Sequence, residues 1–436
     1  MKDKNQKLYS EAIKIIPNGT MLFSKKPEIY LPGKWPTYYS KAKKAYVWDL
    51  EKKKYLDMYF GVGQNTLGYA NMEVDNAVIK SNRNGNMCSL NSDQDVKLAK
   101  KLIKIHPWAG FARFAKSGGE ANAVSIRYAR AISKKDKIAI CGYHGWHDWY
   151  LAANLKSKKK LNDHHIQELK VDGVPKALKN TVYPFRMNNF NDLNKIKKIK
   201  GLGVIKMEVF REKKPNLKFL KNIRKHCDKN NIVLIFDECT SGFRETYGGI
   251  HKNYKIYPDL LMLGKAMGNG YPITSILGRK KFINKVSNCF VSSTFWTERS
   301  GAVAACKTIE IMKRDKTYSK IKKIGKNVKK IWQELSSKHK LKIKIYGLDS
   351  IPCFQFLYKN HLAYKTFLTQ QMLKKRILAT TQIYISIAHE KKHLQNYKNN
   401  LDKIFKLISE FEHNNVPINS FLESKVSEVG FKRYTN

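Results

Sequence analysis

Short runs of apolar residues without alternation mark the middle of this chain. Residues 232–236 and Leu260–Leu263 are apolar at every position, and Phe111–Ala115 and Lys137–Cys141 are further short runs rich in apolar residues. A strand that lacks a polar face is covered on both sides, as the strands of a parallel sheet are. Residues 217–229 precede the first of these runs and fit the helix of a crossover. The pattern therefore predicts an α/β domain with a mainly parallel sheet.

The two ends of the chain follow a different pattern. Residues 45–49 and 54–58 fit two strands around a turn, and the segment 1–70 is expected to contribute to a small domain. Residues 71–312 hold the apolar runs and are expected to form the large domain. Residues 313–436 are expected to complete the small α+β domain. Its predicted elements are helices over 318–338 and 391–412 and strands over 343–346, 353–357 and 383–389.

Composition and charge narrow the possible partners. The 436 residues are 42% hydrophobic and 11% aromatic, with a formal net charge of +48. The basic residues are spread along the whole length without the motif of a nucleic-acid-binding module, so we expect no nucleic-acid partner. A positive field attracts anionic small molecules. The sequence contains no run of about eighteen apolar residues and no apolar signal core, so we expect a cytoplasmic protein without membrane insertion.

The seven cysteines show no close pairing and no spacing typical of a metal site. An odd number of cysteines without close pairing predicts free thiols in a reducing compartment. Without metal-type spacing, we also expect no bound metal. The cysteines stand at positions 88, 141, 227, 239, 289, 306 and 353.

The candidate chemistry lies where two of the apolar runs end. Asp237 directly follows residues 232–236, and a carboxylate at the end of such a strand faces the crevice where open α/β sheets bind ligands. Lys265 follows Leu260–Leu263 and stands among glycines, which let a ligand approach closely. A carboxylate and a lysine at strand ends suit a cofactor with a basic ring nitrogen and an aldehyde. Pyridoxal 5'-phosphate (PLP) has both groups.

Three stretches of sequence carry a family resemblance. Phe-Asp-Glu-Cys-Thr-Ser-Gly-Phe-Arg at 236–244, Tyr-Pro-Asp at 257–259 and Leu-Gly-Lys at 263–265 resemble the signature of the class III aminotransferases, in particular the glutamate-1-semialdehyde 2,1-aminomutase branch. The resemblance spans about residues 15–412. It implies the type I fold of PLP-dependent transferases, with a mainly parallel seven-stranded sheet flanked by helices and a smaller α+β domain. It also implies that Lys265 forms the Schiff base and that Asp237 keeps the ring nitrogen protonated.

Ser117, Gly118 and Gly119 stand directly before an alanine-rich stretch that is expected to be a helix. Free N–H groups at the start of a helix bind anions, and these three residues match the phosphate loop of the family. The family usually has a threonine where this chain has Gly119. The resemblance further implies that Thr294 contacts the phosphate of a neighbouring subunit, so we expect a homodimer with active sites at the subunit interface.

Further cofactor contacts follow from the same resemblance. Tyr143 matches the aromatic residue that stacks on the PLP ring, and Cys239 matches the residue on the opposite face. Glu208 matches the glutamate of a Glu-Pro pair. His144 is expected to line the substrate pocket. Lys25 occupies the place where the aminomutases have an arginine for the substrate carboxylate, a role that lysine fills less well because it lacks the planar fork.

The predicted function is that of an aminotransferase, which moves an amino group from an amino-acid donor, glutamate, to a keto or aldehyde acceptor. Residues 297–299, Thr-Glu-Arg, replace the common Gly-Asn-Pro, as in aminomutase-like aminotransferases of bacterial surface-glycan synthesis. The first alternative is a glutamate-1-semialdehyde 2,1-aminomutase, although the acid expected near Thr381 is missing. A second alternative, of another class, is a non-catalytic PLP-binding or basic interaction protein.

Overall fold

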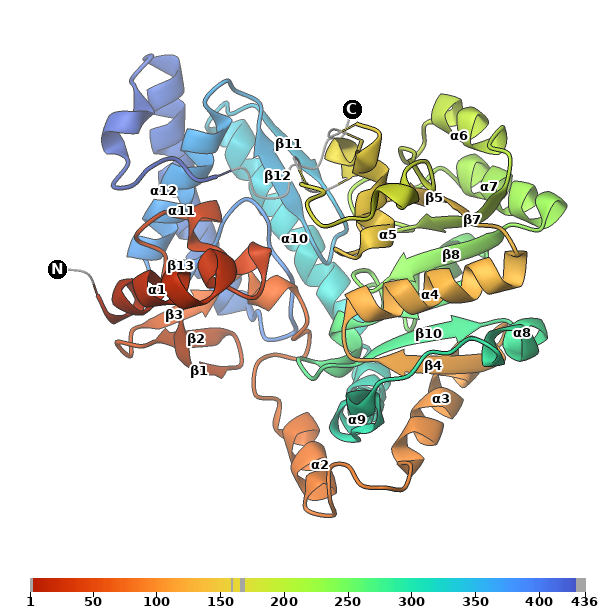
Figure 1. Ribbon diagram of the computed structural model, residues 1–436. Coiled ribbons are helices and arrows are strands. Elements are labelled where there is room, and N and C mark those ends of the chain that lie inside the picture. The colour runs from red at the N-terminus through yellow and green to blue at the C-terminus, as the bar shows by residue number, and fades with distance from the viewer. Residues whose placement is uncertain (1–2, 158–159, 165–168, 429–436) are drawn as a thin grey trace. The chain divides into compact units, whose positions relative to one another are not determined.

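The computed structural model describes residues 3–157, 160–164 and 169–428 (Figure 1). The chain forms two compact units. Among the described residues, the first consists of residues 3–71 and 320–428, and the second is Met72–Ser319. The corresponding boundaries expected from the sequence lie at residues 70 and 313.

A seven-stranded sheet forms the centre of the second unit. Its strand order is β4-β10-β9-β8-β7-β5-β6. The five strands from β9 to β6 run parallel, whereas β10 is antiparallel to both of its neighbours. This confirms the predicted mainly parallel sheet. The strands are β4 (Phe111–Ala115), β5 (Lys137–Cys141), β6 (Val182–Pro184), β7 (Leu202–Met207), β8 (Val233–Glu238), β9 (Leu260–Leu263) and β10 (Thr274–Gly278).

Helices flank this sheet (Figure 1). Helix α4 (Gly118–Ser133) crosses β7, β8, β9 and β10, and its buried residues, among them Ala121 and Val124, join the apolar core with the strands. A capping box at Ser117 and Glu120 starts this helix. The other helices of the unit are α2 (Met72–Asn82), α3 (Asp93–Ile105), α5 (Asp148–Leu151), α6 (Phe190–Lys197), α7 (Leu217–Asn230), α8 (Ile283–Ser287) and α9 (Ser300–Arg314).

The register of the parallel strands brings the candidate residues to one edge of the sheet. Met207 pairs with Phe236, and Asp237 pairs with Met262. Glu208, at the end of β7, therefore lies level with Asp237, and Lys265 follows the end of β9 beside them. The carboxyl ends of parallel strands are where open α/β sheets bind ligands.

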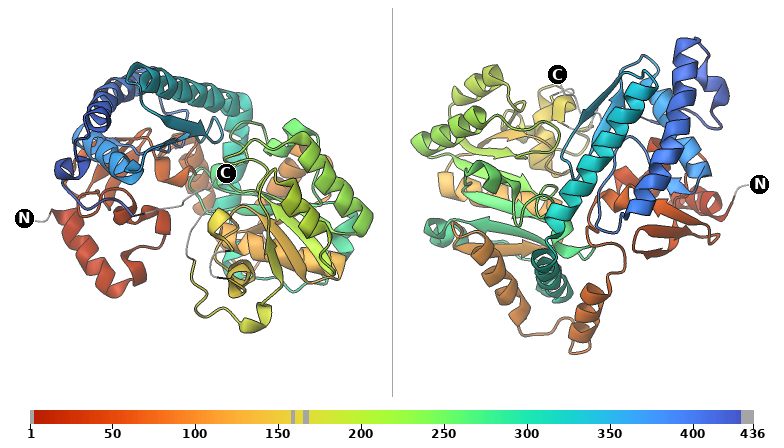
Figure 2. Two further views of the ribbon diagram at one scale, coloured as in Figure 1. Left: turned by 90° about the horizontal axis from the view of Figure 1, so that it is seen from above. Right: turned by 180° about the vertical axis from the view of Figure 1, so that it is seen from behind.

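The first unit is a smaller α+β assembly. A four-stranded sheet has the order β1-β2-β3-β13, and β11 pairs with β12 in a separate hairpin. Helices α10 and α12 lie side by side (Figure 2). A hydrogen bond links them, in which Trp332 Nε1 donates to the Tyr397 hydroxyl at 2.9 Å. The strands are β1 (Tyr39–Lys43), β2 (Tyr46–Asp49), β3 (Lys54–Asp57), β11 (Ile343–Tyr346), β12 (Cys353–Phe356) and β13 (Ile377–Leu378). The helices are α1 (Lys4–Ile15), α10 (Thr317–Lys338), which begins at the end of the second unit, α11 (His361–Lys374) and α12 (Lys391–His413).

The strand predicted over residues 383–389 is wrong. Ile383 and Tyr384 are buried as a strand would be, and their N–H groups donate to the Pro352 and Met58 carbonyls. Next to them, however, only an isolated bridge between Gln382 and Cys353 forms, so residues 383–389 have no continuous strand ladder. The segment is the connection between β13 and α12.

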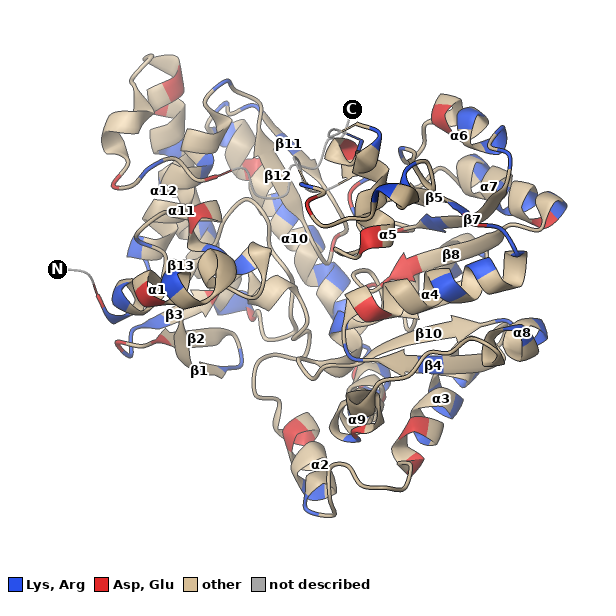
Figure 3. Ribbon diagram, in the orientation of Figure 1, with Lys and Arg blue, Asp and Glu red and all other residues tan. Residues whose placement is uncertain are grey.

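Basic residues lie on helices of both units, as Figure 3 shows. In the part of the chain that is described, none of the helices combines the length and the apolar character needed to cross a bilayer. All seven cysteines are free thiols, as predicted.

Candidate active site

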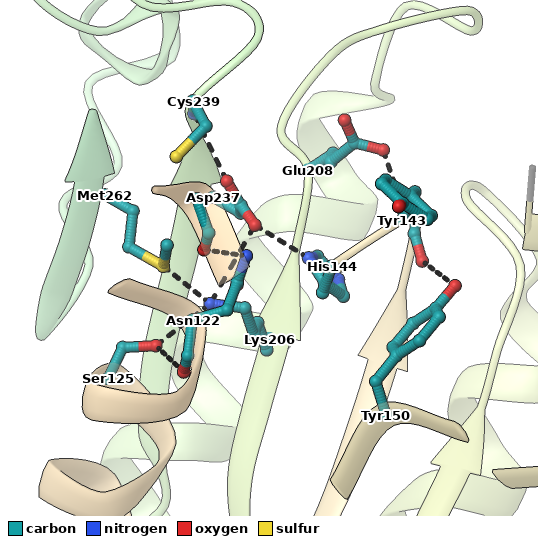
Figure 4. Close-up of polar contacts among 12 residues, drawn as sticks. Asn122, Ser125, Tyr143, His144, Tyr150, Lys206, Glu208, Asp237, Cys239 and Met262 are labelled. Atoms are coloured by element: carbon teal, nitrogen blue, oxygen red, sulfur yellow. Dashed lines mark hydrogen bonds and ion pairs between the residues drawn. The ribbon is translucent and has the colours of Figure 1, made fainter. Parts of the chain in front are cut away.

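Asp237 lies at the end of β8 with its carboxylate buried, 5% exposed. His144 Nδ1 donates to Asp237 Oδ2 at 2.9 Å, and the Cys239 N–H donates to Oδ1 at 3.2 Å (Figure 4). Burial by itself raises the pKa of Asp237, but the nearby Lys206 ammonium and the His144 hydrogen bond outweigh it and hold the pKa below its usual value. Asp237 is therefore a fixed negative charge at the strand edge.

Lys206 is a fully buried lysine in strand β7. Its Nζ lies 3.9 Å from Asp237 Oδ2, and it donates to Ser125 Oγ at 3.1 Å and to Met262 Sδ at 2.8 Å. Burial lowers the pKa of Lys206 to about 8, although the Asp237 charge opposes the change. The sequence pattern did not point to this residue.

Lys265 stands on the short helical turn η9 (Lys265–Gly268), directly after Gly264. Its backbone has φ 41°, a left-handed conformation that costs energy for a side chain longer than glycine. Its Nζ donates to the Thr240 hydroxyl at 3.0 Å. Burial lowers the pKa of Lys265 to about 7, and the Arg211 and Arg244 charges add to the shift. A large fraction of the amine is therefore neutral near pH 7.

The turn that follows β8 contacts both Asp237 and Lys265. Cys239 donates its N–H to Asp237, and the next residue, Thr240, accepts from Lys265. Burial and the Asp237 charge raise the pKa of the Cys239 thiol well above its usual value, while the Lys206 and Lys265 charges oppose the shift. Asp237 and Lys265 thus face the same short turn rather than separate regions of the unit.

Tyr143 and Glu208 meet beside this turn. Glu208 Oε2 accepts from the Tyr143 N–H at 3.0 Å, and Oε1 accepts from Arg211 at 3.0 Å. The Tyr143 ring packs edge-on against Tyr150 at 5.9 Å. Gly142, with φ 111°, allows this approach, because a Cβ there would lie 2.7 Å from Glu208 Oε2.

The predicted phosphate loop forms the first turn of α4. Ser117 caps the helix, accepting from the Glu120 N–H at 3.3 Å. A Cβ at Gly118 would meet no other atom within 4 Å, whereas a Cβ at Gly119 would lie 2.7 Å from His147 Cε1. The His147 ring thus occupies the space that a threonine side chain at 119 would need. His147 Nδ1 is buried and has no hydrogen-bond partner among the described residues.

His144 does not have the predicted position in a substrate pocket. It is fully buried, and its Nδ1 binds Asp237. The rings of Trp149 and Tyr150 lie next to it, at 6.4 Å and 6.0 Å. A side chain with no exposed surface does not offer a contact to a substrate, so the structure makes His144 a partner of Asp237 instead.

The structure does not test the roles of two predicted residues. Thr294 is exposed on the turn η11 (Thr294–Thr297), and none of the contacts found among the described residues links it to Lys265 or Ser117. Lys25 is exposed on a short turn of the first unit. Their predicted contacts stay predictions.

The stretch 297–299 has structural contacts of its own. Glu298 pairs with Lys116, and it accepts from the N–H groups of Ser300 at 2.8 Å and Gly301 at 3.2 Å at the start of α9. The Arg299 N–H donates to the Asn86 carbonyl at 3.1 Å. Both residues hold the backbone at this point of the second unit.

Comparison with known sequences decides the family. The sequence model described as aminotransferase class-III matches residues 32–351, which is more than half of the chain. The chain belongs to this family.

Relatives and solved structures agree with the assignment to class III. The chain is 33% identical to 3-aminobutyryl-CoA aminotransferase of Cloacimonas acidaminovorans (strain Evry), covering 76% of this chain and 79% of the relative. It is 34% identical to glutamate-1-semialdehyde 2,1-aminomutase of Nitrosopumilus maritimus (strain SCM1), covering 74% and 76%. The structure of the PLP internal aldimine form of Sphingopyxis sp. MTA144 FumI has the same fold, with a TM-score of 0.85 at 22% identity over 97% of this chain and 98% of that one.

PLP is the cofactor of this class III enzyme, which is an aminotransferase or an aminomutase. The residues present fit the group. Asp237 offers a buried carboxylate held ionised, Lys265 offers an amine with a pKa of about 7, and the open first turn of α4 offers N–H groups. The described residues contain no cluster of three or more His, Cys, Asp or Glu side chains suited to a metal ion.

Four residues of this class III site were not assigned any role from the sequence. Lys206 was not assigned a role because a single lysine at the end of an apolar run usually marks the exposed end of a strand and not a buried charge. Thr240 and Arg244 lie within the quoted signature, and Arg211 follows Glu208 by three positions. The alternation of strand residues offers one signal, since Lys206 lies two positions before Glu208 and therefore on the same face of β7.

Proposed function

We propose that the chain is an aminotransferase that moves an amino group from an amino-acid donor, glutamate, to a keto or aldehyde acceptor. The observation that carries this proposal is the pairing of Lys265, an amine with a pKa of about 7, with Asp237, a carboxylate held ionised, around one turn. An aminotransferase needs a neutral amine to move a proton and a buried charge to stabilise a cationic ring.

Each predicted residue has a task in this proposal. PLP, when bound, supplies an aldehyde carbon and an electron-accepting ring. With PLP bound, Lys265 would hold the aldehyde carbon, and its amine would move the proton when it is free. Asp237 would pair with the ring nitrogen, and Tyr143 and Cys239 would contact the ring. Glu208 holds the Tyr143 backbone at 3.0 Å. The phosphate is held by Ser117, Gly118 and Gly119.

We further propose a homodimer whose subunits complete each other's sites. Thr294 is exposed in its own subunit, which supports a contact with the phosphate of the neighbouring subunit. The large apolar side chains Phe290 and Phe295, 85% and 68% exposed, lie next to it in the sequence. Exposed apolar groups of this size mark surfaces that bind another protein.

A 2,1-aminomutase is the second candidate, because one relative at 34% identity carries that name. Lys25 instead of arginine and the missing acid near Thr381 favour the aminotransferase. The acceptor is proposed to be a sugar-like ketone or aldehyde of surface-glycan synthesis. The proposed acceptor rests on the resemblance of residues 297–299 to aminomutase-like aminotransferases of surface-glycan synthesis. In the structure, Glu298 of this stretch contacts Lys116 and Ser300 of the protein itself.

Borohydride reduction followed by peptide mapping tests the covalent contact. We expect the label on the peptide that contains Lys265, and we expect Lys265→Ala to lose both the label and the visible absorbance. Lys365→Ala is the matched control, since burial also lowers the pKa of Lys365, in α11, to about 8. A label that remains elsewhere in Lys265→Ala would contradict the proposal.

A second experiment separates the two candidate reactions. The holoenzyme is mixed with single amino acids, and the formation of the corresponding keto acid is measured together with conversion of the cofactor to its pyridoxamine form. Release of 2-oxoglutarate from glutamate is expected of the aminotransferase. Rearrangement of a substrate without release of any keto acid would identify an aminomutase.

A further inference from the structure

We infer that Lys206 is a positioning residue whose ammonium partly neutralises the carboxylate of Asp237. It thereby reduces how strongly Asp237 stabilises a protonated ring nitrogen of the cofactor. This inference rests on the proposed role of Asp237. It concerns a lysine that the family resemblance did not assign, and it states how strongly the site favours a protonated ring.

The contacts of Lys206 come from three neighbouring elements (Figure 4). From β7 its Nζ reaches Ser125 Oγ in α4 at 3.1 Å and Met262 Sδ in β9 at 2.8 Å. Asp237 Oδ2 in β8 lies at 3.9 Å. The side chain has no exposed surface, so water does not screen its charge. A hydroxyl and a thioether carry no charge of their own and leave the ammonium to act on Asp237.

Lys206 is not needed to satisfy the hydrogen bonds of Asp237. His144 already donates to Oδ2, and the Cys239 N–H already donates to Oδ1. At 3.9 Å the ammonium lies beyond hydrogen-bond distance from the carboxylate. Its contribution is therefore charge rather than a missing donor. A methionine has similar volume and would fill the same space beside Met262 without the cost of burying an ammonium.

The physical consequence follows from the sign of the charges. A cation beside a carboxylate lowers its affinity for a proton, and it repels any second cation that approaches the same carboxylate. The protonated ring of PLP would be that second cation. Lys206 thus opposes the effect of Asp237, so that the ring nitrogen is protonated less completely than Asp237 alone would cause. The strength of the electron sink is set by both residues.

The holoenzyme with PLP labelled with ¹⁵N at the ring nitrogen tests this directly. In Lys206→Met, we expect the pH at which half of the ring nitrogens are protonated to rise by about one unit, which is about a tenfold gain in proton affinity. We also expect about tenfold tighter PLP binding, because the repulsion is gone. The ¹⁵N shift reports the ring itself, so a purely structural role of Lys206 would leave it unchanged.

Lys365→Met is the control, because Lys365 also has a pKa lowered by burial to about 8 but belongs to the first unit, where it donates to the Ile29 carbonyl at 2.9 Å. Lys206→Gln provides a second neutral variant that keeps a donor for Ser125, should the methionine variant not fold. An unchanged ring-nitrogen midpoint in the folded Lys206 variant, or an equal change in Lys365→Met, would overturn the inference. Failure of the proposed function is a different result, namely a wild-type protein without covalently bound PLP.

Discussion

The two ends of the candidate site are built in opposite ways. At one end, Asp237 and Lys206 extend from neighbouring strands and His144 follows β5, and all three side chains are almost without exposed surface. Their opposite charges and hydrogen bonds compensate one another. At the other end, Lys265 stands on a short turn with a left-handed backbone, and its amine has a neutral hydroxyl as partner. The nearby charges of Arg211 and Arg244 oppose its protonation.

This difference teaches how one sheet edge can hold a fixed charge and a reactive amine close together. Regular strands and buried partners keep Asp237 ionised. Burial and cationic neighbours leave Lys265, on a turn with a strained backbone, easily deprotonated. Strain at a functional residue persists only where the surrounding structure fixes it, and the packed strands on either side provide that support.

Removing the fixed charge should have the largest effect. Asp237→Asn keeps the size of the side chain but no longer stabilises a ring cation, so we expect the rate of amino-group transfer from the donor to fall by at least about 100-fold. The rate is measured from the absorbance change when an amino acid is added to the holoenzyme. His144→Gln, which leaves the charge in place, should lose less activity than Asp237→Asn. Equal losses in the two variants would contradict the distinction between charge and hydrogen bond.

The reactivity of Lys265 should change with pH near neutrality. Since the pKa of Lys265 is lowered to about 7, its neutral fraction rises with pH below 7 and levels off above it. We expect the rate of PLP incorporation into the apoenzyme to rise about tenfold for each pH unit well below 7 and then to level off. Stopped-flow absorbance measures this rate. A rise that continues towards pH 10 would mean that Lys265 behaves as an ordinary exposed lysine.

The predicted phosphate loop should resist added volume at Gly119. Gly119→Thr places a Cβ 2.7 Å from His147 Cε1, so the ring must move and the first turn of α4 is disturbed. We expect PLP to bind about tenfold more weakly, which corresponds to about 1.4 kcal/mol. The double variant with His147→Gly should recover most of the affinity, because it provides the space. Equal affinity in the single and double variants would contradict this packing argument. Fluorescence titration of the apoenzyme gives both dissociation constants.

The smallest effect is expected at the hydroxyl partner of Lys265. Thr240→Val keeps the shape of the side chain and removes the oxygen that accepts from Lys265 Nζ at 3.0 Å. Loss of one hydrogen bond costs about 1 kcal/mol, so we expect about a fivefold slower donor half-reaction. Thr240→Ser should retain the wild-type rate, since it retains the acceptor. If valine and serine give the same rate, the hydroxyl does not position Lys265.

The sequence was sufficient for most elements of the second unit because their signals are local. A wholly apolar run such as Leu260–Leu263 fixes both the strand and its burial, and its bounds in the structure are those predicted. The short edge strand Val182–Pro184 was missed, since three residues that include a proline give no pattern. At residues 383–389 the opposite happened, because a strand was predicted where none forms. An apolar pattern indicates burial, but it does not reveal whether a buried extended segment forms a continuous ladder with a neighbouring strand.

The sequence by itself determined the α/β class, the family resemblance and the placement of Asp237 and Lys265 at strand ends, because strand patterns and short motifs depend on neighbours in the chain. Only the tertiary structure decided that Lys206 lies buried 3.9 Å from Asp237, that His144 binds this carboxylate and that His147 fills the space beside Gly119. Each of these contacts joins residues from separate elements. Their distances depend on strand register and helix packing, which a local pattern does not contain.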